Sequence, residues 1–165
     1  MERSPDVSLP PFEQIVADHG PAVLRVCRAV LGPHEAEDAW SEAFLSALKA
    51  YPALRPDSNV RAWLVTIAHR KAVDGYRSRV RAPIPTGDLP ERPGHVDTSE
   101  PDEALWAAVR ALPPKQRAAV AYRYLADMSY VDIAALLGNS EAAARRNAAD
   151  GIAALRTAYS QEERA

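Results

Sequence analysis

A proline-rich segment in the middle of the chain constrains the fold most. Residues 82–101 contain five prolines and two glycines and show no amphipathic period, which is typical of an extended linker. A structureless stretch of this length is unusual inside one compact domain. The 165-residue chain is therefore predicted to form two small domains, at residues 10–81 and 101–160, joined by a linker at 82–100.

Charge is segregated along the chain, although the net charge is only -2. Residues 61–81 carry six basic side chains against Asp74, a balance of +5, whereas residues 82–103 carry six acidic side chains against Arg92, a balance of -5. The near-neutral total thus conceals a basic patch and an acidic linker.

Helical periodicity occurs in both halves and no strand pattern occurs in either, so the predicted fold class is all-α. The N-terminal half predicts helices over residues 12–30, 34–51 and 59–79. We expect His19-Gly20-Pro21 to bend or break the first helix and Pro52 to end the second. Cys27 lies in the apolar pattern of the first helix and is expected to be a small buried side chain. The residues expected on the buried side of the second helix are Trp40, Ala43, Phe44, Ala47, Leu48 and Tyr51.

The helix predicted over residues 59–79 combines an apolar stripe, a tryptophan and a basic end. Trp63, Ile67 and Val73 recur near helical spacing, with Leu64, Ala68 and Ala72 beside them. The basic side chains expected in solvent are Arg61, His69, Arg70, Lys71, Arg77 and Arg79. Two interpretations stay open: a surface that stacks on bases and contacts phosphates, or a core helix whose tryptophan is simply packed.

Acidic residues occupy the outer face of the helix predicted over residues 34–51. Glu35, Asp38 and Glu42 follow one another at steps of three and four. Carboxylates near a helix N-terminus complement its dipole, which explains Glu35 and Glu37. Glu42 lies too far along the helix for that explanation.

The C-terminal half predicts helices over residues 101–111, 113–125, 129–137 and 140–159. The last two form a helix-turn-helix pattern, with Gly138 in the tight turn, Ser140 as the next N-cap and the small Ala134 where the helices approach. An ordinary helical hairpin is the alternative to DNA binding.

Enzymatic functions find no support in the sequence. The four histidines are scattered over separate segments. Three of them have a nearby carboxylate in the sequence, but one such pair is weak evidence for a metal or acid–base site: His34 with Glu35, His69 with Asp74 and His95 with Asp97. No phosphate-binding loop, nucleophile motif or cysteine pair occurs. We therefore expect no catalysis, no metal and no cofactor. With no apolar run near the roughly 18 residues of a membrane span and no signal peptide pattern, we expect a cytoplasmic protein that does not insert into membranes.

Four sequence blocks in this order resemble the extracytoplasmic-function (ECF) group of bacterial RNA polymerase sigma factors. They are AEDAWSEAF at residues 36–44, VRAWLVTIA at 60–68, LPPKQR at 112–117 with YRYL at 122–125, and MSYVDIAALLG at 128–138. The resemblance spans nearly the whole chain and implies a transcription initiation factor that binds core RNA polymerase and directs it to promoters.

The resemblance also implies three sets of site residues. The helix carrying Glu35, Asp38, Ser41 and Glu42 would dock on the largest polymerase subunit. The following helix and the loop before it would capture single-stranded DNA at the minus-ten element, through Arg55, Asn59, Arg61, Trp63, His69, Arg70, Lys71 and Arg77. The family often buries the indole at Trp63, so the packed alternative applies there.

The C-terminal helix-turn-helix would read the minus-thirty-five element and sit on the second-largest polymerase subunit, with Ser140, Arg145, Arg146 and Asn147 as its DNA-binding residues. The family usually has further polar and basic residues there, whereas this chain has Ala143, Ala144, Ala148 and Asp150. The acidic linker resembles the segment that threads near the polymerase active centre, although a solvated tether would have the same composition.

The sequence thus predicts an initiation factor whose partners are core RNA polymerase and promoter DNA, with an anti-sigma factor as a further candidate partner. Two alternatives remain: a helix-turn-helix regulator that binds DNA without polymerase, and a degenerate sigma-like protein that binds polymerase or a regulator without initiating.

Overall fold

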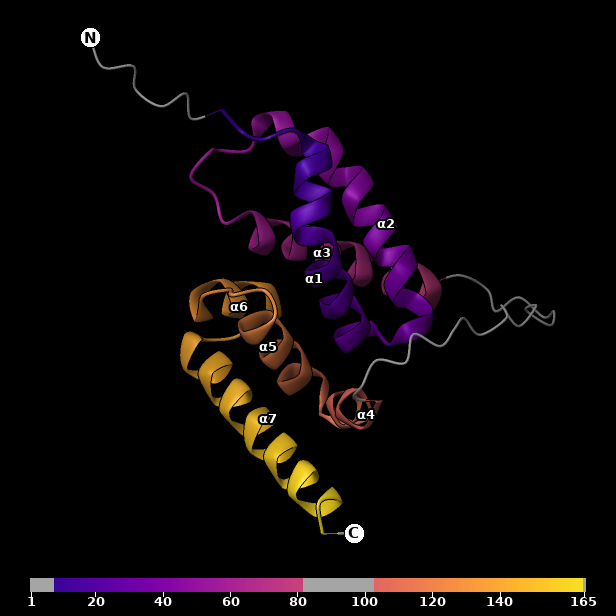
Figure 1. Cartoon of the computed structure of the whole chain (residues 1–165), viewed down its shortest axis with the longest axis vertical. Helices are drawn as coiled ribbons and strands as arrows, with labels where there is room; N and C mark the ends of the chain where they lie inside the picture. Colours follow the sequence, from indigo (N-terminus) through magenta and orange to yellow (C-terminus); the bar gives the residue numbers. More distant parts are fainter. Residues whose placement is uncertain (1–7, 82–102, 165) are drawn as a thin grey trace, which may run out of the picture.

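The computed structural model describes residues 8–81 and 103–164, and the side chains of residues 76–81 and 162 are not described. Within these ranges every regular element is helical, which confirms the predicted all-α fold (Figure 1). The order is α1 (Phe12–Leu31), α2 (Pro33–Ala50), a 3-10 turn (Tyr51–Ala53), α3 (Val60–Arg81), α4 (Glu103–Ala111), α5 (Pro114–Tyr124), α6 (Tyr130–Leu137) and α7 (Glu141–Glu162). The acidic linker predicted at 82–100 lies outside the described residues, so the domain bounds remain a prediction.

Helix α1 corrects one expectation, because it runs unbroken past Pro21. Ile15 precedes the proline and Val23 and Val26 follow it, and all three are buried in one hydrophobic core cluster. Burial of one continuous stripe outweighs the single hydrogen bond that proline removes. The helix ends instead at Gly32, whose φ of +82° favours glycine, and Pro33 opens α2.

The first three helices pack pairwise around a core in which Phe44, Leu64 and Val65 are almost completely buried. The Trp40 indole N–H donates a hydrogen bond to the Gly20 carbonyl at 3.0 Å and ties α2 to α1. Leu48 was expected on the buried side of α2 but is 51% exposed. Leu48 lies four residues after the buried Phe44, but the next residue of α2 that is buried in the core is Ala47.

Helices α5 and α7 form the tightest pair in the C-terminal half. Gly151 of α7 is buried, and a Cβ built on it would lie 2.5 Å from Val120 Cγ2 of α5. Ala144 and Ala148, on the same face of α7, are completely buried. The small side chains of α7 therefore allow close helix contact.

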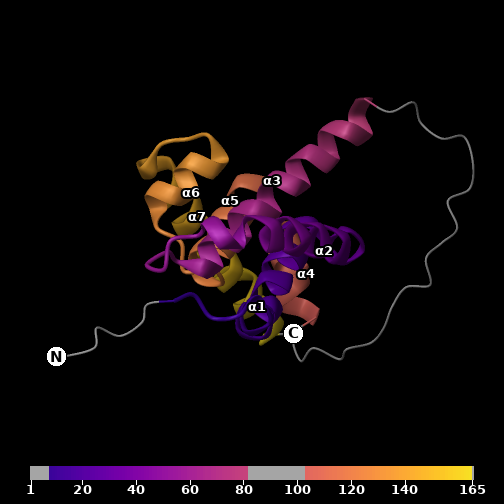
Figure 2. The same cartoon turned by 90° about the horizontal axis from the view of Figure 1, so that it is seen from above.

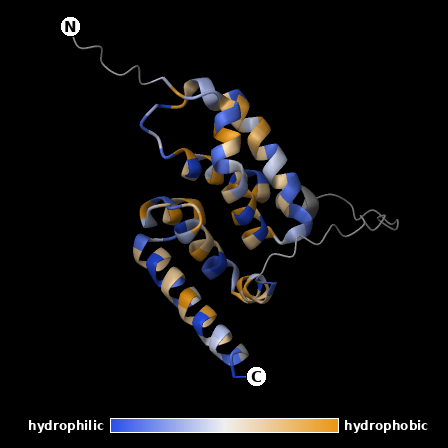
Figure 3. Cartoon of the chain, viewed as in Figure 1, coloured by the Kyte–Doolittle hydropathy of each residue, from blue (hydrophilic) through white to orange (hydrophobic). Residues whose placement is uncertain are grey.

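The two halves pack against each other instead of standing apart (Figures 1 and 2). Helix α1 contacts α4 and α5. The Arg117 guanidinium donates to the carbonyls of Val30 at 3.3 Å, Arg110 at 2.8 Å and Leu112 at 3.0 Å, so one side chain joins α1 to the α4–α5 turn. In Figure 2 the C-terminal end of α3 projects beyond the other helices, and Figure 3 shows that the helices mix hydrophilic and hydrophobic residues, as amphipathic helices do.

Candidate polymerase and nucleic-acid interfaces

The acidic stripe of α2 comprises Glu35, Asp38, Ser41 and Glu42, and most of it faces solvent. Asp38, Ser41 and Glu42 are exposed, and Glu35 is half-buried. Sequence reasoning missed that Leu45 and Leu48, which are 63% and 51% exposed, continue the same stripe. Their spacing of seven residues from Asp38 and Ser41 was the signal that could have found them. The outer face of α2 therefore offers carboxylates and apolar contacts together.

The loop before α3 holds two predicted nucleic-acid residues, Arg55 and Asn59. Arg55 is exposed and lies 3.6 Å from the Asp57 carboxylate, also exposed. The Asn59 side-chain oxygen accepts a hydrogen bond from the Ala62 backbone N–H at 3.1 Å. Asn59 is therefore the N-cap of α3, and its exposed amide NH₂ group is left to contact a base.

Arg61 and Trp63 lie at the start of α3 and are both half-buried. Arg61 Nε is buried and has no hydrogen-bond partner within the described residues. Burial lowers the pKa of the neighbouring His19, and the Arg61 charge lowers it further. The Trp63 ring lies 6.5 Å from the Tyr51 ring and packs on the core. Trp63 thus combines both of the interpretations left open by the sequence: one part is packed and another part reaches solvent.

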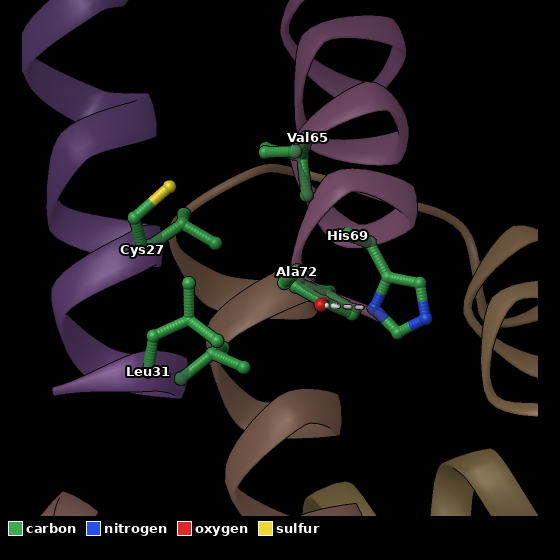
Figure 4. A pocket seen from close by; sticks show the side chains of 9 residues that line it. Cys27, Leu31, Val65, His69 and Ala72 are labelled. Atoms are coloured by element: carbon green, nitrogen blue, oxygen red, sulfur yellow. Dashed lines mark hydrogen bonds between the residues drawn. The ribbon is translucent and has the colours of Figure 1, made fainter. Parts of the chain in front are cut away.

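His69 lies at the contact between the two halves of the molecule. Its Nδ1 is 2.6 Å from the Tyr122 hydroxyl of α5, and the two rings meet edge to face at a centroid distance of 5.6 Å (Figure 4). Burial lowers the pKa of His69, a hydrogen bond to the Leu136 carbonyl raises it, and the Arg70 charge lowers it. Burial also raises the pKa of Tyr122. In this arrangement the Nδ1 atom of His69 is engaged by α5 and the side chain is half-buried, so its role in nucleic-acid binding stays a prediction.

Three further basic residues of α3 were predicted to contact DNA. Arg70 is exposed and Lys71 is half-buried. Arg77 lies on the projecting end of α3, and its side chain is outside the described set.

The cavity beside His69 is too small for a ligand. The cavity is lined by α1, α3 and α5 (Figure 4). Its volume of about 10 Å³ is barely enough for one water molecule. Cys27 lines it, is 3% exposed as expected, and has its pKa raised to about 12 by burial. The cavity is a packing gap, and the Cys27 thiol is unreactive there.

The helix-turn-helix has the local geometry that the sequence predicted. Gly138 ends α6 with a φ of +67°, and the Ser140 hydroxyl accepts the Ala143 backbone N–H at 3.1 Å, which confirms it as the N-cap of α7. Arg145 and Arg146 are exposed and Asn147 is half-buried. Arg145 Nη2 donates to the Glu141 carboxylate at 2.8 Å, so this predicted DNA-binding side chain already forms an ion pair within α7.

Residues 8–81 and 103–164 contain neither a cluster of metal ligands nor a helix that could span a membrane. No group of three or more candidate metal ligands occurs there. The helices in these ranges also lack the combination of length and apolar character that crossing a membrane requires.

Two conserved family regions match this chain. Sigma-70 region 2 matches residues 15–82 and Sigma-70, region 4 matches residues 102–155. The chain is 33% identical to the RNA polymerase sigma factor CarQ of Myxococcus xanthus over 94% of this chain and 93% of CarQ. It is 31% identical to the ECF RNA polymerase sigma factor BldN of Streptomyces coelicolor over 87% of this chain and 58% of BldN.

The chain is an ECF sigma factor of the sigma-70 family. As such it is a transcription initiation factor that binds core RNA polymerase and promoter DNA.

Two solved structures share the fold. One is RpoE in complex with the anti-sigma factor NepR from Bartonella quintana, with a TM-score of 0.68, 22% identity, and coverage of 90% of this chain and 96% of RpoE. The other is CnrH in complex with the cytosolic domain of CnrY, with a TM-score of 0.60, 24% identity, and coverage of 91% and 88%.

The predicted site residues of this sigma factor fall on separate surfaces. The acidic stripe and the loop before α3 lie in region 2, and Ser140, Arg145, Arg146 and Asn147 lie in region 4. Sequence reasoning missed Tyr130, whose ring stacks with Arg123 and Arg145. Nothing in the spacing of these residues indicated it, since α5, α6 and α7 meet only in the folded domain.

Proposed function

We propose that the acidic stripe of α2 is the surface that docks on the largest subunit of core polymerase. Asp38, Ser41 and Glu42 are exposed and follow one another on one face. The exposed Leu45 and Leu48 extend that face with apolar surface, which a partner would remove from water. This mixed exposed face, within a chain that matches Sigma-70 region 2, is the observation that carries the proposal.

Minus-ten recognition and melting are assigned to α3 and the loop before it. Arg55 and Arg70 are exposed and Lys71 is half-buried, which suits contact with phosphates. Arg61 and Trp63 offer partly exposed groups beside them, Asn59 offers its amide, and Arg77 adds charge farther along. His69 would join this set only after α5 and α6 move away from it.

Minus-thirty-five recognition is assigned to the N-terminal part of α7. Arg145 and Arg146 are exposed, and bidentate arginine contacts to guanine are each worth about 1 to 3 kcal/mol. Ser140 caps α7 five residues before Arg145, and Asn147 directly follows Arg146. This region would rest on the second-largest polymerase subunit.

An anti-sigma protein is the second candidate partner. The RpoE structure is described as a complex with the anti-sigma factor NepR. We place the protein in the cytoplasm, where its polymerase acts, and assign it no catalytic step of its own.

Abortive transcription with purified core polymerase tests the assignment. Promoters would be selected from a genomic library, and wild type would be compared with Asp38→Ala/Glu42→Ala and Arg70→Ala/Lys71→Ala. We expect the first pair to lose core binding and the second to bind core but lose open-complex formation. Matched controls with the same charge changes on other exposed positions, Glu13→Ala/Asp18→Ala and Arg25→Ala/Arg156→Ala, should initiate like wild type.

Two other outcomes would replace the proposal. Core binding without initiation on any selected promoter would favour a degenerate sigma-like protein. DNA binding without any core binding would favour an independent helix-turn-helix regulator.

A further inference from the structure

Apart from Glu141, the neighbours of Arg145 along the recognition helix α7 are mostly alanines. Arg145 follows three alanines, and Ala148 and Ala149 come after Asn147. Alanines cannot hold a long flexible side chain in one orientation. A recognition helix of this kind binds DNA well only if something else fixes its arginines before binding.

The structure places an aromatic ring where that support is needed. Arg145 Cζ lies 4.6 Å from the centroid of the Tyr130 ring, and Arg123 Cζ lies 4.4 Å from the same centroid. These distances are within the range of a cation–π interaction. One ring thus joins three helices: Arg123 from the end of α5, Tyr130 from the start of α6 and Arg145 from α7.

Each arginine in this stack also has a second anchor. Arg123 Nη1 donates to the Met128 carbonyl at 3.0 Å, and Arg145 Nη2 donates to the Glu141 carboxylate at 2.8 Å. Tyr130 itself follows the Ser129 cap, whose hydroxyl accepts the Asp132 backbone N–H at 3.1 Å. The ring is therefore attached to a capped helix end and is a firm platform for both guanidinium groups.

The Arg145 side chain remains 59% exposed in this arrangement. A guanidinium stacks through its face, whereas its N–H donors point outward in its plane. A guanidinium has five N–H donors, so the contact with Glu141 leaves others available for acceptors such as guanine O6 and N7.

We propose that Tyr130 is a positioning residue that holds Arg145 of α7 for contact with the minus-thirty-five duplex. Arg123 stacks on the same ring and braces it. The proposal rests on the assignment of Arg145 to minus-thirty-five recognition.

The test uses holoenzyme reconstituted from core polymerase and the full chain. Initiation is measured on a selected promoter and on a copy with a scrambled minus-thirty-five element, and the ratio of the two rates reports recognition. Tyr130→Leu keeps an apolar side chain but removes the ring, and it should lower the ratio about threefold, near the value of an exposed cation–π contact. Tyr130→Phe keeps the ring and should retain the ratio within about twofold of wild type.

A double-mutant cycle distinguishes positioning from general stability. If Tyr130 acts through Arg145, Tyr130→Leu should have almost no further effect on the ratio in an Arg145→Ala background. Equal losses on both promoters, or the same loss with Arg145 already removed, would show a merely structural role and overturn the proposal. An unchanged ratio in Arg145→Ala alone would instead overturn the assignment of Arg145, and the positioning role with it.

Discussion

At the scale of single residues, Asn59 has two candidate roles, capping of a helix and contact with DNA. The sequence placed it in a loop predicted to bind single-stranded DNA, and the structure uses its oxygen to cap α3. A cap contributes about 1 kcal/mol because it satisfies a backbone N–H that the helix itself leaves unpaired. A loss of transcription on mutation of Asn59 could therefore come from an unstable α3.

Substitution of Asn59 separates the two roles. Asn59→Ala should lower the free energy of unfolding by about 1 kcal/mol, and Asn59→Ser should lower it by only a few tenths because serine is also a good cap. Urea unfolding followed by circular dichroism measures both. Equal losses in the two variants would contradict a capping role, and loss of promoter opening in Asn59→Ser despite normal stability would support contact of the amide with DNA.

At the scale of elements, packing decided where helices continue and how closely they approach. Pro21 leaves α1 intact because buried residues on both sides hold one stripe against the core. Gly151 weakens its helix by propensity, yet it also makes room for Val120 of α5. Helix propensity is a local quantity, and both cases show tertiary burial overriding it.

Substitution of Gly151 tests the α5–α7 contact. Gly151→Ala should destabilise the protein by about 1 to 3 kcal/mol, since overpacking exceeds the roughly 1 kcal/mol that alanine gains in a helix. Thermal and urea unfolding report the change. In a Val120→Ala background the same substitution should become neutral or stabilising, because the methyl group that a Cβ would meet at 2.5 Å is gone.

Gly75 provides the matched control. It lies in α3, is exposed, and a Cβ built on it meets nothing within 4 Å. Gly75→Ala should therefore stabilise the protein by about 0.5 to 1 kcal/mol. A similar loss of stability at Gly75 and Gly151 would remove close packing as the explanation.

At the scale of the whole molecule, the two halves are closed on each other through His69, Tyr122 and Leu136. The minus-ten and minus-thirty-five elements lie about 25 base pairs apart, or roughly 85 Å along B-DNA. Helix α3, with 22 residues, is only about 33 Å long. Helices α3 and α7, to which we assign the two elements, cannot span this distance while the His69–Tyr122 contact holds α3 against α5, so we expect this contact to break when the protein works on a promoter.

Acid should weaken the contact through His69. Because burial lowers its pKa in the closed state, the released ring takes up a proton first as the pH falls below its ordinary value of 6.5. The stabilising contribution of His69 is thus complete above about pH 6.5 and declines as the pH falls from there through the lowered pKa. Small-angle scattering or a distance label on each half, measured between pH 8 and 5, should show opening toward the acid end.

A non-titrating variant isolates the effect of His69. His69→Gln keeps hydrogen-bonding groups but cannot take up a proton, so its opening should depend less on pH than that of wild type. His19, whose pKa is also lowered by burial, lies away from this contact beside Arg61 and remains in both proteins. The same pH dependence in both would assign the titration to His19 or another group.

The helices and the helix-turn-helix were predictable because their signals are local. The all-α class, the Ser140 cap, the Gly138 turn and the buried Cys27 follow from spacing and residue type along the chain, and the structure confirms them. The functional residues were only partly predictable. Exposure of Asp38 and Arg70 followed from periodicity, whereas the burial of His69 against α5 did not.

The sequence by itself determined the elements, the segregation of charge and the family, because each is encoded in residues that are neighbours along the chain. Only the tertiary structure decided that the two halves pack against each other and that His69 contacts Tyr122. It also decided that Gly151 leaves room for the Val120 side chain and that Tyr130 lies beside Arg145. Each of these contacts joins residues from different helices. Their formation depends on how buried surfaces and side-chain volumes fit together in three dimensions, which spacing along one helix does not specify.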